Sequence, residues 1–151
     1  MSKIAILVSI LLSTYSGSSR IKVIEYISQY ANIAQSEQKR TGIPASVKLA
    51  QAILEGGFGA SYLAKHKNNH FGIKYRWRKL YKNYRVYYTV LESYQDHSNY
   101  LVERCPHLFR YGKDWIKWCD TLGRCNYAHG SSNYGGKLKK IIKDYKLYKL
   151  D

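Results

Sequence analysis

Apolar residues recur along most of the chain at intervals of three and four, the spacing that places them on one face of a helix. The first such stretch covers residues 21–40, where Val23, Ile27 and Ala34 fall on one stripe. Gly42 then stands where a glycine commonly ends a helix. Alternating, strand-like patterns are scarce and the sequence has only two prolines. The pattern therefore predicts a mainly α-helical fold.

A second helix is expected from Pro44 to Glu55, because proline is well tolerated in the first turn of a helix. Its buried face should consist of the apolar residues Val47, Leu49, Ala50, Ile53 and Leu54. Further helices are predicted at residues 60–66, 89–104, 114–122 and 134–145. The helix at residue 89 begins with Thr-Val-Leu-Glu, which matches the capping box S/T-x-x-E.

The least helical part of the chain is KYRWRKLYKNYRVYY, residues 74–88. Aromatic and basic residues alternate there, which indicates a hairpin or an extended arm. The expected fold class is thus an α-rich domain with a small β-hairpin or extended lobe.

The first 19 residues have the pattern of a secretory signal peptide. Lys3 precedes the apolar run IAILVSILL, and the small and polar residues STYSGSS follow. This run has nine residues, whereas a membrane-spanning helix needs about 20. The alternative is a buried N-terminal helix or strand. We expect a signal peptide at 1–19, a single domain at 20–151, and export to the periplasm or the extracellular space.

The formal net charge is +15, and it becomes +14 without Lys3 (15 − 1). Such a charge favours polyanionic partners, among them nucleic acid, anionic lipid and the bacterial cell wall. Nucleic acid is not expected, because no recognised basic-helix or RNA-binding motif accompanies the charge. A monomer is expected.

The three cysteines, Cys105, Cys119 and Cys125, form no CxxC pair, so a zinc ribbon is not expected. Three separate small core residues are favoured over one disulfide bond with one free thiol. The histidines lack the HExxH spacing of a zinc site. Neither a metal nor another cofactor is predicted.

Glu55 ends the apolar second helix, and Gly56, Gly57 and Gly59 follow it. A carboxylic acid that donates a proton at neutral pH needs a raised pKa. The apolar helix favours desolvation of Glu55, and the negative end of the helix dipole disfavours its ionised form by about 0.3–1 kcal/mol. The glycines would let a polymer pass close to the backbone. The alternative interpretation is a surface glutamate followed by a glycine C-cap.

The segment GIPASVKLAQAILEGGFGASYLAKHKNNHFGIK, residues 42–74, resembles the core motif of the endo-β-N-acetylglucosaminidases of glycoside hydrolase family 73. The similarity continues in LESYQDHSNYL (91–101), LF (108–109), WIKWCDTL (115–122), NYA (126–128) and IIKDYKLYKLD (141–151). It covers nearly all of residues 20–151. These enzymes are peptidoglycan hydrolases of the autolysin and flagellar type, so the resemblance implies a lysozyme-like fold and that activity.

The resemblance implies that Glu55 is the catalytic acid, which protonates the glycosidic oxygen as the bond breaks. Tyr127 matches the family's YA tyrosine and would position a water or stabilise the developing charge. Many family members have a second glutamate after the FGIK motif, whereas this sequence has no Asp or Glu from Gly56 to Leu91. The substrate's N-acetyl group, Tyr127, or Glu92 or Asp96 would have to take its place.

Four further positions are expected at the substrate. Asn68 and Asn69 match the family's NN pair and would bind the N-acetyl group, or else fold their own loop through side-chain-to-backbone bonds. Phe71 is expected to pack under the site. Trp77 would stack on a sugar face.

The predicted function is cleavage of the β-1,4 bond between N-acetylglucosamine and N-acetylmuramic acid. The expected partners are the glycan strands of peptidoglycan and the anionic cell wall. Two alternatives stay open: a lytic transglycosylase, and a basic wall-binding protein with little or no catalytic turnover.

Overall fold

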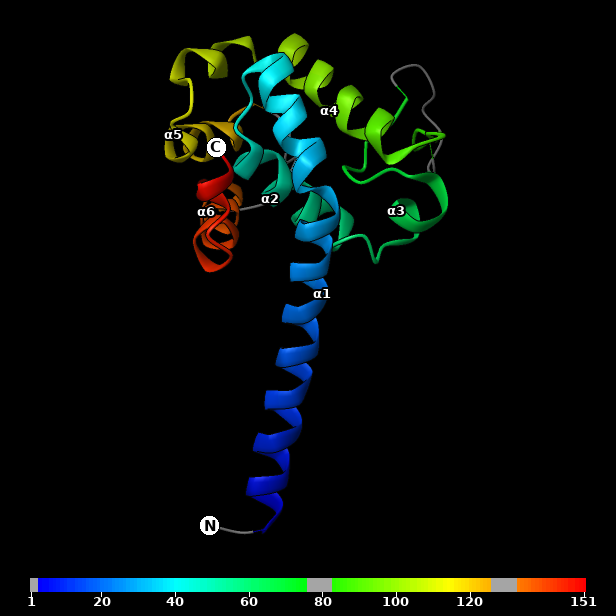
Figure 1. The fold of residues 1–151 in the computed structure, drawn as a ribbon, viewed down its shortest axis with the longest axis vertical. Helices are drawn as coiled ribbons and strands as arrows, with labels where there is room; N and C mark the ends of the chain where they lie inside the picture. Colours follow the sequence, from blue (N-terminus) through cyan, green and yellow to red (C-terminus); the bar gives the residue numbers. More distant parts are fainter. Residues whose placement is uncertain (1–2, 76–82, 126–132) are drawn as a thin grey trace.

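The computed structural model describes residues 3–75, 83–125 and 133–151, with side chains from residue 17 onward. Its elements in chain order are α1 (Lys3–Thr41), α2 (Ala45–Gly56), α3 (Tyr62–Lys67), α4 (Val90–Arg104), the 3-10 helix η1 (Pro106–Tyr111), α5 (Trp115–Leu122), α6 (Tyr134–Asp144) and the 3-10 helix η2 (Leu147–Leu150) (Figure 1). The prediction of a mainly α-helical fold is confirmed. Across these described stretches, no helix combines the length and the apolar character needed to cross a membrane.

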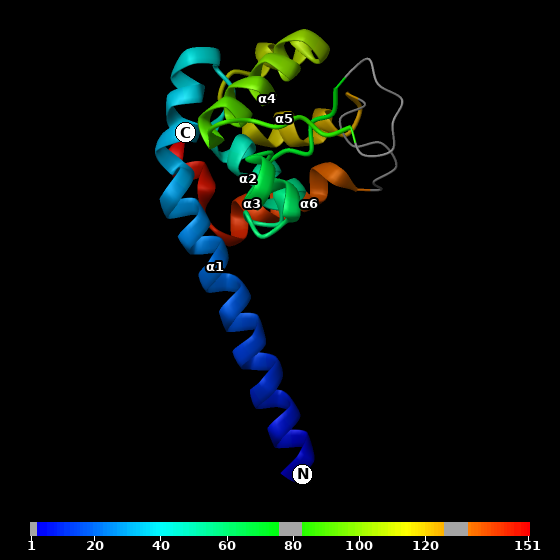
Figure 2. The ribbon, with the colours of Figure 1, turned by 90° about the vertical axis from the view of Figure 1, so that its right-hand side faces the viewer.

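Helix α1 is much longer than the predicted helix at 21–40, because it continues unbroken back to Lys3. Figures 1 and 2 show its first part projecting from the body of the molecule, while its second part lies along that body. Val23, Tyr26 and Ala34 are buried there, and α1 contacts α2 and α4. The signal peptide at 1–19 stays a prediction.

Helix α2 forms the centre of the fold. Every residue from Ala45 to Ile53 is buried, because α1, α5, α6 and η2 all contact this helix. The predicted apolar face of α2 was therefore too narrow, since the polar residues between the apolar ones are buried as well.

One of these buried polar residues is Lys48, whose amine needs hydrogen-bond partners inside the core. Its Nζ donates to the Tyr94 carbonyl at 3.1 Å and to the Ser98 hydroxyl at 2.6 Å, and it lies 2.9 Å from Nδ1 of His97. The Ser98 hydroxyl in turn donates to Glu37 at 2.5 Å. This network joins α1, α2 and α4 through the core.

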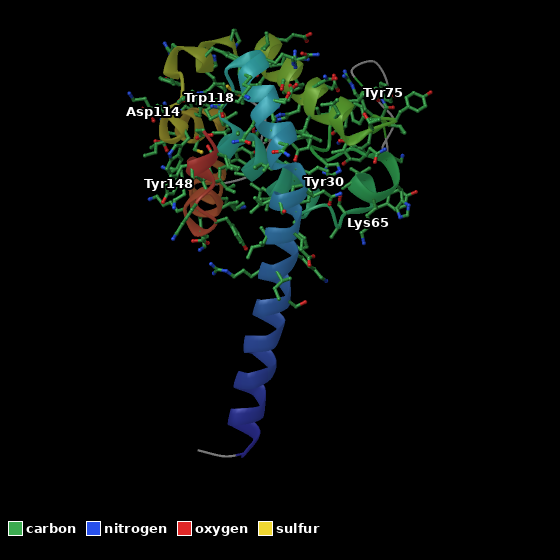
Figure 3. All side chains as sticks on the ribbon, viewed as in Figure 1. Tyr30, Lys65, Tyr75, Asp114, Trp118 and Tyr148 are labelled. Carbon is green, nitrogen blue, oxygen red and sulfur yellow. The ribbon has the colours of Figure 1, made fainter. Side chains whose placement is uncertain are left out.

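The predicted hairpin or extended arm contains two short antiparallel segments. An isolated bridge joins Lys74 to Tyr84, and the N–H of Tyr75 donates to the Asn83 carbonyl at 2.9 Å. The small lobe with Tyr75 lies on the opposite side of α1 from Trp118 and Tyr148 (Figure 3). A small extended lobe beside the helices is therefore confirmed.

The ends of the helices follow local rules that the sequence could show in part. The Thr89 side chain accepts from the N–H of Glu92 at 3.2 Å, as the capping box predicted. The start of α2 is held from a distance: the Asp151 carboxylate accepts from the N–H of Ser46 at 2.8 Å and from its hydroxyl at 2.6 Å. A carboxylate at this end of a helix is favoured by the helix dipole. The helices η1 and η2 were not predicted.

Candidate active site

Glu55 lies in the last turn of α2, which ends at Gly56, one residue beyond the predicted end. Gly57 follows in the left-handed conformation with φ 56°, and its N–H bonds to the Ile53 carbonyl. Only glycine adopts this conformation without steric cost. The glycine C-cap, which belonged to the alternative interpretation of this segment, is therefore present, and it turns the chain away directly after the carboxylate.

Gly56 has a different role from the one expected for it. A Cβ atom at this position would lie 2.7 Å from the carbonyl oxygen of His70. The missing side chain at Gly56 thus lets the loop at His70 approach the end of α2. Gly59 likewise lies against the ring of Tyr26, 3.1 Å from where a Cβ would stand. At these two positions the missing side chain makes room for another part of the protein, and the expected passage of a polymer beside the glycines stays a prediction.

The carboxyl group of Glu55 combines access to solvent with a raised pKa. Its side chain is exposed, yet the surrounding protein removes enough water to raise the pKa above its ordinary value. A hydrogen bond from Tyr134 and the positive charge of Lys137 act against this effect and lower the pKa. Burial outweighs both, so the pKa moves in the direction that the sequence predicted.

Tyr134 and Gln51 connect Glu55 to the core. Tyr134 begins α6 and is 3 % exposed. Its hydroxyl accepts a hydrogen bond from Nε2 of Gln51 at 3.2 Å, which leaves the hydroxyl proton free to be donated to Glu55. Gln51 lies one helical turn before Glu55, so both side chains leave the same face of α2. Sequence reasoning missed both residues, although the four-residue spacing was a usable signal for Gln51.

Asn68 and Asn69 hold the loop between α3 and the small lobe. Asn68 caps α3 with φ 49°, and its Nδ2 donates to the carbonyls of Tyr87 and Tyr88, each at 3.1 Å. Asn69 is fully buried. Its Nδ2 donates to the carbonyls of Ile73 and Arg85, each at 2.9 Å. These contacts correspond to the loop-folding alternative, and the predicted binding of substrate by the two asparagines stays a prediction.

Phe71 is 3 % exposed and stacks on His97, with ring centroids 3.9 Å apart. It therefore belongs to the core, as a residue that packs under the site would, and its surface is not free to contact a sugar directly. Trp77 and Tyr127 lie outside the described residues, so their roles stay predictions.

The two carboxylates considered as a second catalytic group are both engaged. The two carboxylate oxygens of Asp96 accept from Nη1 of Arg85 at 2.6 Å, and one of them also accepts from the Tyr87 hydroxyl at 2.5 Å. Glu92 accepts from the N–H of Tyr88 at 2.9 Å, within the cap of α4. Both residues thus have structural contacts that explain their presence. Over residues 3–75, 83–125 and 133–151, no cluster of histidine, cysteine and acidic side chains could hold a metal ion.

A helical core that presents a carboxylic acid at the end of its central helix, beside a small extended lobe, defines a lysozyme-like glycoside hydrolase domain. The catalytic domain of the autolysin Auto from Listeria monocytogenes has a similar fold, with a TM-score of 0.73 and 24% identity over 86% of this chain and 88% of that one. The chain belongs to the glucosaminidase family, because the family model described as mannosyl-glycoprotein endo-β-N-acetylglucosaminidase matches residues 31–147.

Two curated relatives agree with this family. The chain is 29% identical to an autolysin of Enterococcus faecalis over 152 residues, which cover 84% of this chain and 21% of the relative. It is 26% identical to the exo-glucosaminidase LytG of Bacillus subtilis over 156 residues, which cover 83% of this chain and 52% of the relative. The chain thus spans about a fifth of the first relative and about half of the second.

Proposed function

We propose that this chain is a peptidoglycan hydrolase that cleaves the β-1,4 bond between N-acetylglucosamine and N-acetylmuramic acid, with Glu55 as the general acid. Membership of the glucosaminidase family supports the substrate class. The observation that carries the catalytic assignment is the environment of Glu55. This residue is accessible to solvent, yet the protein around its carboxyl group removes enough water to raise its pKa.

The neighbours of Glu55 suit both states of a proton donor. Before the reaction, partial desolvation favours the protonated form, which can donate to the glycosidic oxygen. After the transfer, the hydrogen bond from Tyr134 and the charge of Lys137 stabilise the carboxylate that forms. Interactions that strengthen as charge develops lower the barrier more than interactions present from the start.

The second catalytic role is proposed for Tyr127 or for the N-acetyl group of the substrate. The contacts of Asp96 with Arg85 and Tyr87 support a structural role for that carboxylate, and the cap of α4 does so for Glu92. A water positioned by Tyr127 would attack from the far side of the sugar and invert the anomeric centre. Attack by the N-acetyl group would retain it, so NMR of the first-formed product distinguishes the two routes.

The proposal is tested with purified protein and peptidoglycan. We expect muropeptides with N-acetylglucosamine at the reducing end, identified by mass spectrometry. Glu55→Gln should lower the rate by about 10²–10⁴-fold, the usual contribution of a general acid. Glu103→Gln is the matched control, because Glu103 is an exposed glutamate of α4 and should leave the rate unchanged. Full activity of Glu55→Gln would remove Glu55 from the catalytic role.

Two alternatives give different products in the same assay. A lytic transglycosylase would release anhydro-muramyl products, which are lighter by one water. A wall-binding protein without turnover would sediment with peptidoglycan and release nothing soluble. The absence of any Asp or Glu from Gly56 to Leu91 motivates this second alternative, because glycosidases normally need a second catalytic group.

We also propose that the chain acts outside the cytoplasm and that its basic surface attaches it to the anionic cell wall. The formal net charge of +15 supports this attachment. Because salt screens charges that are exposed to water, binding to isolated walls should weaken steeply as the ionic strength rises. Binding that does not change with salt would contradict an electrostatic attachment.

A further inference from the structure

Cys105 and Cys125, which lie 20 residues apart in the sequence, meet in the structure. Cys105 follows the last residue of α4, and Cys125 ends the turn after α5. The Cys105 thiol lies 3.7 Å from the Cys125 carbonyl oxygen, and the two side chains are in hydrogen-bond contact with each other. The exposed fraction is 0% for Cys105 and 9% for Cys125. The two sulfurs therefore face each other inside the protein.

A third group belongs to the same cluster. Nε2 of His107, from η1, lies 3.3 Å from the Cys125 sulfur. An imidazole nitrogen at this distance can accept the thiol proton, and the thiolate is the form that attacks a disulfide. The cluster thus brings together two thiols and a base.

Cys119, in contrast, lies in α5 with its backbone against α6. A Cβ atom at Gly135 would stand 2.3 Å from the Cys119 carbonyl oxygen, which shows how closely the two helices approach there. The Cys119 thiol is fully buried. Burial is the main cause of its raised pKa, Asp120, Lys139 and Asp151 have smaller effects, and neither of the other cysteines contributes. The structure thus separates the three cysteines into one pair and one single residue.

We propose that Cys105 and Cys125 form a disulfide bond when the chain folds in an oxidising compartment, and that Cys119 keeps its thiol. The sulfur–sulfur bond forms as both S–H bonds break, with the release of two protons and two electrons. The electrons reduce a thiol–disulfide oxidoreductase of that compartment or a small-molecule disulfide such as oxidised glutathione. The oxidising location depends on the export proposed above, whereas the pairing of the two sulfurs does not.

The bond should form late in folding, when the two thiols and His107 come together but water still reaches them, and not in the finished protein. Burial raises the pKa of the Cys105 thiol to about 12, so little thiolate is present once the core has closed. After closure, the same burial protects the bond from reduction. The closed loop contains η1 and α5, which the bond would tie to the end of α4.

The test uses the full chain, unfolded in reductant and refolded with a mixture of reduced and oxidised glutathione. Free thiols are then alkylated in denaturant, and the peptides are identified by mass spectrometry. We expect a linked peptide pair that contains Cys105 and Cys125, and alkylation at Cys119 alone. Cys119→Ser should still form the same link. Closing a loop of this length predicts a rise in Tm on the order of 10 °C over the reduced protein, which Cys105→Ala with Cys125→Ala should lack.

Alkylation of all three cysteines after oxidative refolding would overturn the proposal, and so would a link that includes Cys119. A Tm that falls on oxidation would also overturn it, because the native positions of the two sulfurs would then not accommodate the bond. None of these results depends on peptidoglycan, so a failure here leaves the proposed hydrolase activity unaffected. Conversely, a chain that does not cleave peptidoglycan could still form the bond between Cys105 and Cys125.

Discussion

Removal of the Tyr134 hydroxyl should change both the stability of the protein and the titration of Glu55. This hydroxyl is buried between Nε2 of Gln51, at 3.2 Å, and the carboxylate of Glu55. In Tyr134→Phe, Nε2 of Gln51 loses this acceptor, and Oε1 of Gln51 already has no partner among the described residues. A buried polar group without a partner costs about 1–3 kcal/mol. This cost corresponds to a fall in Tm of about 3–10 °C for a domain of this size.

The effect on Glu55 has a definite sign. The hydrogen bond from Tyr134 stabilises the ionised carboxylate and lowers its pKa, so its removal should raise the pKa further. A general acid works in its protonated form. The alkaline limb of the pH–rate profile should therefore move to higher pH in Tyr134→Phe.

The pKa can be measured without turnover, by NMR titration of protein labelled with ¹³C at the glutamate carboxyl groups. Glu55→Gln identifies the resonance. Tyr148→Phe is the matched control, because it removes the same atom from a tyrosine of η2. The ring of Tyr148 stacks on Trp115 of α5. An unchanged or lower pKa of Glu55 in Tyr134→Phe would refute the argument that Tyr134 donates to the ionised carboxylate.

Three further predictions concern groups outside the site. Burial lowers the pKa of Lys48 to about 7 and Glu37 acts against this effect, so Glu37→Gln should leave Lys48 neutral and the Glu37 hydrogen bonds weakened. We expect a cost of about 1–3 kcal/mol in urea unfolding; adding Lys48→Met should recover part of this, and a neutral result for Glu37→Gln alone would contradict the network. Burial lowers the pKa of His70 to about 4, so from pH 6.5 down to about 4 only the unfolded chain binds this proton. The free energy of unfolding should therefore decrease as the pH is lowered through this range, by up to about 1.4 kcal/mol per pH unit. An equal slope in His70→Gln would show that His70 is not the cause. Asp151→Ala removes the carboxylate that caps α2 at Ser46 and should cost about 1–2 kcal/mol, whereas an unchanged Tm would show that the cap does not contribute.

Local features of the chain could be predicted from the sequence. Helical spacing and the Thr89 cap each involve residues within one or two turns, and the structure contains both. The direction of the pKa change at Glu55 was also predicted, although the desolvation that raises the pKa comes from all of the protein around the carboxyl group. The family motif added the proposed role of Glu55 as the catalytic acid, which spacing alone did not provide.

Other features depend on residues that only the folded chain brings together. The sequence did not indicate that Tyr134 would reach Glu55 from α6, that Asn69 would be fully buried, or that Cys105 would meet Cys125. Each of these features depends on how different segments of the chain pack, and the order of residues along one segment does not specify which other segment will pack against it.

The sequence by itself thus determined most of the α-helices, some of their ends and the position of one acidic residue at the end of the central helix. The tertiary structure decided which groups surround that acid and which candidate residues are already occupied by other contacts. The physical reason is that helix formation depends on neighbours within a few residues, whereas desolvation, hydrogen bonding and charge at a site depend on every element packed around it.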